Sequence, residues 1–194
     1  MLAKGPALPD FFNEVPIRMP SKEFIKGFRH ELANRAFAFL AVGRMAERLE
    51  GDARGLFWKT YLELEVFNGP RYEVAARRWG LGVTPGIGSR LKAWAVSSVP
   101  NAFHGLLLKV VYRETLKYLE WLKDLRRQGP ADARAFLDYM VHQEEVQIEM
   151  MRIALTGHYS EITGSADDFF LKYNGRVRLF NDGESRTSME SSPH

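Results

Sequence analysis

The chain contains no cysteine among its 194 residues, and this absence limits its chemistry. Without thiols there is neither a disulfide framework nor a thiolate metal site, so a bound metal would need oxygen or nitrogen ligands. Long apolar runs are also missing, because no stretch reaches the roughly 18 residues of a membrane-spanning helix. The N-terminal sequence MLAKGPALPDFF lacks the continuous apolar core of a signal peptide. These absences predict a soluble, cytoplasmic protein with no membrane partner.

Charge of one sign is barely in excess, with a net charge of +3 and a pI of about 9.2. Lysine and arginine are spread along the chain rather than gathered in one patch, which does not favour nucleic-acid binding. The length and the hydrophobic content of 45% suit one well-packed domain. We predict that this domain covers residues 1–175 and that a flexible C-terminal tail covers residues 176–194.

Apolar residues recur at the helical spacing in four long segments, and no convincing pair of strands appears. The first expected helix follows a cap at Ser21, and glycine or proline separates the others. The Gly69-Pro70 pair predicts a break or a sharp kink at the end of the second helix, followed by a shorter helical continuation, RYEVAARRW. The four expected helices cover residues 22–50, 53–68, 102–127 and 131–156, and a modest helical stretch is expected around 89–98.

The connections between these segments predict how they are arranged. Short loops join the first helix to the second and the third to the fourth, so each pair should form an antiparallel hairpin. A much longer connection separates the two hairpins, and it can run back along a bundle. The predicted fold is therefore all-α, a four-helix bundle of two antiparallel hairpins joined by a long crossover.

On helical wheels, each of the four long segments turns one glutamate toward its apolar face. A carboxylate in an apolar core costs several kcal/mol unless it is paired or protonated, so four of them need an explanation. Two of the glutamates are followed three residues later by an amide, as in the stretch ELEVFN. The inward-facing polar residues are Glu31, Glu65, Asn68, Glu114, Glu144 and Gln147.

The order Glu, Glu-x-x-Asn, Glu, Glu-x-x-Gln resembles the ferritin-like di-iron carboxylate proteins, whose usual pattern is Glu, Glu-x-x-His, Glu, Glu-x-x-His. The intervals are also similar, short within each hairpin and long across the crossover. The resemblance covers residues 22–156 and implies an oxidoreductase that uses dioxygen or a small-molecule substrate, and it allows a homodimer. It implies iron or manganese held by Glu31, Glu65, Glu114 and Glu144, with Asn68 and Gln147 as weaker ligands or orienting groups.

The sequence departs from the family pattern at both histidine positions, and two alternatives stay open. In one, the bundle binds no metal and serves as a binding or structural module, with Arg35 and the two amides satisfying the carboxylates. Arg35 is the single basic residue expected on the inward faces, and one guanidinium is expected to bridge two carboxylates at most. In the other, a heme-oxygenase-like bundle uses His30 or His142 as a ligand, although both fall outside the apolar arcs.

Overall fold

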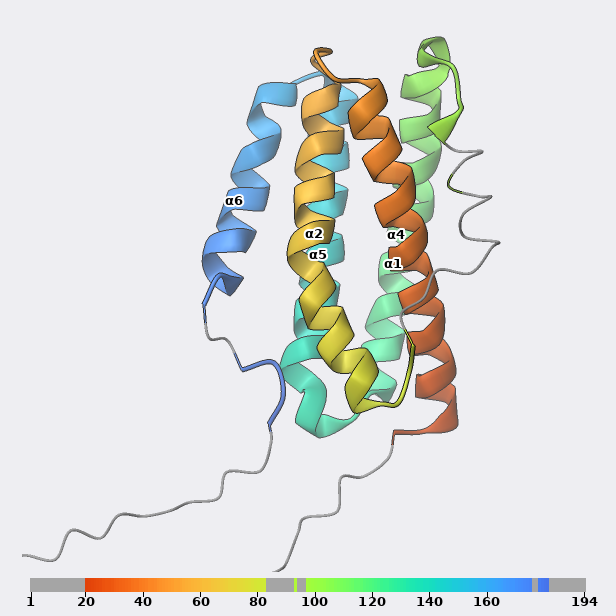
Figure 1. The fold of residues 1–194 in the computed structure, drawn as a ribbon, viewed down its shortest axis with the longest axis vertical. Coiled ribbons are helices and arrows are strands. Elements are labelled where there is room, and N and C mark those ends of the chain that lie inside the picture. Colours follow the sequence, from red (N-terminus) through yellow and green to blue (C-terminus); the bar gives the residue numbers. More distant parts are fainter. Residues whose placement is uncertain (1–19, 83–92, 94–96, 176–177, 182–194) are drawn as a thin grey trace, which may run out of the picture.

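The computed structural model describes residues 20–82, 93, 97–175 and 178–181. This part of the chain is helical without strands, which confirms the predicted all-α class (Figure 1). None of its helices is both long and apolar enough to cross a membrane. The described α-helices are α1 (Lys22–Arg48), α2 (Gly55–Arg78), α4 (His104–Gln128), α5 (Arg134–Thr156) and α6 (Ile162–Tyr173), and short 3-10 turns at Asn101–Phe103, Ala131–Ala133 and Tyr159–Glu161 precede the last three.

The start of α1 and the turn into α2 follow from local chemistry. The hydroxyl oxygen of Ser21 accepts a hydrogen bond of 3.1 Å from the backbone N–H of Phe24, so the predicted cap is present. The turn between α1 and α2 is tight enough that a Cβ at Gly55 would overlap the backbone carbonyl oxygen of Leu49. A glycine at the first residue of α2 is therefore a steric requirement of the hairpin.

Helix α2 continues through Pro70 to Arg78, so the expected helical continuation is present, but a break at Gly69-Pro70 is absent. A proline inside a helix removes one hydrogen bond and costs about 3 kcal/mol. The turns after the proline bury Tyr72, Ala75 and Ala76 in the core, and this burial offsets the loss. The axis of α2 bends in its middle, so that its second half leans toward α1 (Figure 1).

The helices pack as two antiparallel hairpins, α1 with α2 and α4 with α5, as the loop lengths predict (Figure 1). Contacts of α1 with α4 and of α2 with α5 bring the hairpins together. A further helix, α6, packs on α5 and α2 and was not expected from the sequence. Its buried stripe of Ile162, Ala166, Phe169 and Tyr173 has ordinary helical spacing. The described arrangement therefore contains one helix more than the predicted bundle.

Residues 178–181 return to the helices instead of forming part of a flexible tail. The backbone N–H of Phe136 donates to the carbonyl of Leu179 at 3.0 Å, and that of Asn181 donates to the carbonyl of Asp132 at 2.8 Å. The ring of Phe180 packs on Phe136. The tail prediction therefore does not hold for these four residues, while 176–177 and 182–194, like most of the helical stretch expected around 89–98, lie outside the described residues.

Candidate functional site

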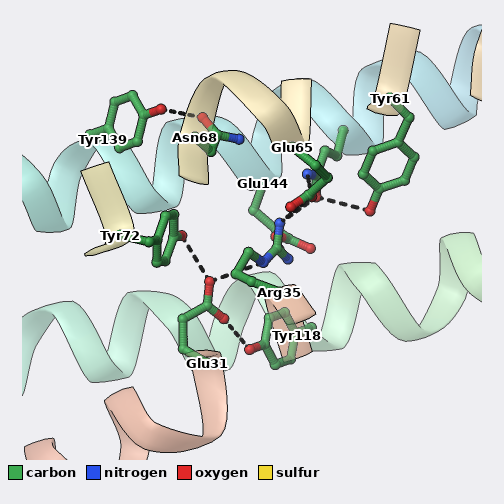
Figure 2. A network of polar contacts seen from close by, with 10 residues as sticks. Glu31, Arg35, Tyr61, Glu65, Asn68, Tyr72, Tyr118, Tyr139 and Glu144 are labelled. Carbon is green, nitrogen blue, oxygen red and sulfur yellow. Dashed lines mark hydrogen bonds and ion pairs between the residues drawn. The ribbon is translucent and has the colours of Figure 1, made fainter. Parts of the chain in front are cut away.

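Five of the six polar residues predicted to face inward lie in the interior of the described helices. Glu31 comes from α1, Glu65 and Asn68 from α2, and Glu144 and Gln147 from α5. Each is at most 5% exposed, which is rare for carboxylates. Figure 2 shows the side chains of Glu31, Glu65 and Glu144 converging from three helices, and the burial of this many polar groups identifies the candidate site.

Arg35 lies at the centre of these side chains (Figure 2). Its Nη1 donates to Oε1 of Glu65 at 2.9 Å, and its Nη2 donates to Oε2 of Glu144 at 2.8 Å. Its Nε lies 3.2 Å from Oε1 of Glu31. The guanidinium thus contacts three carboxylates from three helices, and the expectation of two at most is wrong. Each nitrogen of the planar fork faces a different helix, which makes three partners possible.

Neutral hydrogen-bond donors complete the surroundings of two of the carboxylates. Glu31 accepts from the hydroxyl of Tyr72 at 2.8 Å and from the hydroxyl of Tyr118. Gln147 donates through Nε2 to Oε1 of Glu65 at 2.7 Å. Its Oε1 accepts from the hydroxyl of Tyr61 at 3.2 Å. We name Arg35 and its carboxylate partners Glu31, Glu65 and Glu144, with Gln147 and these tyrosines, the Arg35 network.

The charges in the Arg35 network do not balance when every group is ionised, because three carboxylates face one guanidinium. Burial raises the pKa of Glu144 to about 7, against the opposing effect of Arg35. Burial also raises the pKa of Glu65, and Arg35 again opposes the rise. Burial disfavours the charge on Arg35, yet the three carboxylates together raise its pKa well above the ordinary value. The network therefore holds its cation firmly and at neutral pH retains part of a proton.

Glu114 is the predicted site residue that lies outside the cluster. Its carboxylate pairs with Lys117 at 2.7 Å, and its side chain is 64% exposed, so the prediction that it faces inward is wrong. The buried stripe of α4 runs through Thr115, Leu119 and Leu122. Glu114 precedes this stripe by one residue and is rotated by about 100° from it.

Two buried amides keep unpartnered atoms. Oδ1 of Asn68 accepts from the hydroxyl of Tyr139, but its Nδ2 has no hydrogen-bond partner. Gln143, which is fully buried on α5, has no partner for either amide atom. The wheel missed Gln143 because the residue stands one position before Glu144 and is therefore rotated by about 100° from it around the helix axis. Gln143 lies four residues after buried Tyr139 and four before buried Gln147, and this helical spacing was the available signal.

The two histidines proposed as heme ligands lie outside the group of carboxylates around Arg35, although the ring centre of His30 is 6.3 Å from that of Tyr118. His30 is exposed and packs edge-on against Trp121, with ring centres 5.2 Å apart. His142 is half-buried, and its Nδ1 lies 3.1 Å from the hydroxyl of Tyr173 on α6. Its position under α6 differs from the exposed position that the wheel assigned.

The residues of the cluster do not fit a di-metal centre of the ferritin-like kind. Arg35 lies between the carboxylates that would hold the ions, Glu114 lies outside, and no histidine joins the cluster. Within the described ranges, no group of three or more histidine, aspartate or glutamate side chains is arranged to hold a metal ion. The donor set instead suits a cation with directional N–H groups.

A pocket of about 450 Å³ between α1 and α2 reaches the Arg35 network. Arg35, Glu65 and Asn68 form its polar lining at the buried end. Phe39 and Val66, which are 46% and 59% exposed, lie in its lining on the solvent side. The pocket therefore connects solvent to the buried charges.

A comparison of the chain with protein-family models, curated proteins and solved structures finds no match. The chemistry of the site is therefore argued from its own geometry.

Proposed function

We propose that this protein is a metal-free, ferritin-like helical bundle that acts as a binding module, with Arg35 in the role that metal ions have in the family. The observation that carries the proposal is the contact of one guanidinium with Glu31, Glu65 and Glu144. Two antiparallel hairpins joined by a long connection, with inward glutamates on α1, α2 and α5, support the ferritin-like part of the proposal.

Electrostatics argues against a metal sharing this position with Arg35. A divalent ion bound by Glu65 and Glu144 would lie within a few ångströms of a guanidinium in a buried environment, where like charges repel strongly. Moving Arg35 aside would break three ion pairs, and removing one partner from a buried pair typically costs about 3–5 kcal/mol. The carboxylates are therefore better explained as the anchor of the arginine than as open ligands.

Binding, rather than scaffolding alone, is supported by the pocket that leads from solvent to Glu65 and Asn68. A protein that needed the network only for stability would have no use for an opening of about 450 Å³ onto it. The di-iron or dimanganese oxidoreductase implied by the family pattern stays a prediction, which the following experiment tests.

The test is metal uptake by the purified chain after anaerobic loading with ferrous iron and removal of unbound metal. We expect the wild type to retain no stoichiometric iron or manganese. An Arg35→Met variant that folds should retain more than the wild type, because its carboxylates are released. Retention of about two ions per wild-type chain, lost in Glu65→Ala, would overturn the proposal in favour of the di-metal centre.

A further inference from the structure

The pocket between α1 and α2 has the size and the wall chemistry of a small-molecule site. Its volume of about 450 Å³ lies within the range of roughly 300–1,000 Å³ found for such sites. Small residues create the space, because Ala36 lines it from α1 and Gly69 from α2. A Cβ built on Gly69 would meet no heavy atom within 4 Å.

The walls of the pocket are apolar and its charged groups are mostly acidic. Leu32, Phe39, Leu40 and Val66 form much of the wall. Glu65 lies at the buried end, and Glu73 lies at the exposed side. Arg35 also lines the pocket, but its three nitrogens already face three carboxylates. A ligand therefore meets an apolar pocket with the carboxylate of Glu65 at its buried end and that of Glu73, paired with Arg77 at 3.5 Å, at its exposed side.

Glu65 retains an oxygen that can accept a further hydrogen bond. Its Oε1 accepts from Arg35 and from Gln147, whereas its Oε2 accepts no bond from the described residues. The Arg35 network also has fewer positive than negative groups, so one more cation would improve its charge balance. We propose that the pocket binds a small organic ammonium ion with an apolar body, whose N–H groups donate to Glu65. This inference rests on the proposed function, because it requires that the carboxylates are not occupied by metal.

Asn68 adds a second polar contact at the buried end of the pocket. It is 1% exposed, and its Nδ2 is a donor without a partner. An unpaired buried donor destabilises the protein by about 1–3 kcal/mol, so binding of a ligand whose oxygen accepts a hydrogen bond from it is favoured. The ligand class that satisfies both groups is an apolar amine with a hydroxyl close to its nitrogen.

An anionic amphiphile of the same shape does not suit this pocket. A carboxylate at the buried end would face Glu65 and the excess negative charge of the network, whereas the nitrogens of Arg35 already face three carboxylates. A neutral alcohol would fill the apolar walls without gaining a charge-assisted hydrogen bond. The sign of the charge on the ligand therefore discriminates between these occupants.

The experiment compares octylamine, octanol and octanoate by isothermal titration calorimetry with the full-length protein at neutral pH, where an alkyl ammonium keeps its proton. We expect octylamine to bind at least about tenfold more tightly than octanol or octanoate. The amino alcohol of the same chain length should bind more tightly than octylamine. Equal or tighter binding of octanoate, or no binding of any of these probes, would overturn the inference; an amino alcohol weaker than octylamine would overturn the role of Asn68.

Two variants locate the binding in the pocket. Gly69→Leu should fill the pocket and weaken octylamine binding by at least about tenfold, while improving the helix propensity of α2. Gly164→Leu is the matched control, because Gly164 is also a helical glycine with open space around it, but on α6. Glu65→Gln should reduce the preference for octylamine over octanol by about tenfold. Unchanged binding in Gly69→Leu would place the amine elsewhere and overturn the site.

The metal measurement and the amine measurement test the proposed function and the ligand class separately. Stoichiometric iron in the wild type would overturn the proposed function, whatever octylamine does. A chain that retains no iron and shows no preference for the amine would overturn the ligand class alone. The titrations are therefore performed on protein treated with a chelator and on protein loaded with ferrous iron.

Discussion

Arg35 connects three helices through its guanidinium, and its loss would leave three buried carboxylates without a cation. We predict that Arg35→Met lowers the free energy of unfolding by about 3–5 kcal/mol, as expected when one partner of a buried ion pair is removed. Urea unfolding followed by circular dichroism measures the change. Arg44→Met, at an exposed position of the same helix, is the control and should change little. Equal stability of the two variants would mean that the carboxylates are neutralised without Arg35.

Glu144 links the stability of the fold to pH. Its pKa is raised by burial to about 7, so the folded state holds the proton more tightly than the unfolded chain. The contribution of Glu144 to the free energy of unfolding is fully present below the ordinary pKa of a glutamate and is lost as the pH rises toward 7. We predict that the wild type loses on the order of 3 kcal/mol relative to Glu144→Gln between about pH 4.5 and 7. Urea unfolding across this range measures the difference.

The matched control for that series is Glu145→Gln, at the exposed neighbouring position. If the free energy of unfolding changes with pH by the same amount in Glu144→Gln and in Glu145→Gln, Glu144 is not the group that links stability to pH.

Single residues also show how much of the site was readable from the sequence. Helical wheels correctly turned Glu31, Glu65 and Glu144 inward, because each shares a helix face with buried apolar residues. The wheel failed at Glu114, because α4 has two adjacent apolar stripes and only packing decides which is buried. One passes through Leu119 and Leu122, and the other passes through exposed Val110. The number of partners of Arg35 depends on distances between helices, which a wheel does not contain.

At the scale of elements, the α1–α2 hairpin depends on a glycine at its turn. A Cβ at Gly55 would overlap the carbonyl oxygen of Leu49, and a backbone atom cannot move aside as a side chain can. We predict that Gly55→Ala lowers the free energy of unfolding by roughly 1–3 kcal/mol. Thermal and urea unfolding measure the change.

Gly164→Ala serves as the control for Gly55→Ala, because an added Cβ meets nothing there. It should stabilise the protein by up to about 1 kcal/mol through helix propensity alone. A Gly55→Ala protein as stable as this control would contradict the steric requirement.

The elements themselves were predictable to different degrees. The bounds of α1, α4 and α5 follow from caps, spacing and glycines, which act locally. A helical continuation after Pro70 was predictable, but its direct continuity with the first part of α2 was not, because that depends on burial of Tyr72 and Ala76 against other helices. Helix α6 was missed although Phe169 and Tyr173 belong to a regular apolar stripe, because the segment is short and the family pattern ended before it.

At the scale of the whole molecule, the segment 178–181 joins the C-terminal part of the chain to the helices. Phe180 packs on Phe136 and on Trp79, with ring centres 5.3 and 6.2 Å apart. We predict that Phe180→Ala lowers the free energy of unfolding by about 1–3 kcal/mol, through loss of apolar burial and ring contacts. Leu171→Ala, at a position that is 79% exposed, is the control and should have little effect. Equal unfolding midpoints for the two variants would show that the segment adds no stability.

The pairing of the helices was predictable from loop lengths, since short loops leave adjacent antiparallel packing as the simplest arrangement. The sequence did not predict whether the buried carboxylates bind a metal or an arginine. Both readings need the same inward residues, and they differ in whether the guanidinium of Arg35 reaches Glu65 and Glu144. That distance depends on the packing of α1 against α2 and α5.

The hydroxyls around the Arg35 network give the protein an internal optical reporter of its own unfolding. Burial raises the pKa of Tyr61, Tyr72 and Tyr118 above the ordinary value. In moderate alkali the folded chain keeps the three phenolic protons, whereas an unfolded chain releases them at about pH 10. Stability from these groups is complete below that pH and is lost above it. An alkaline titration should therefore show the phenolate absorbance of these tyrosines appearing in one cooperative step, together with the loss of helical circular dichroism.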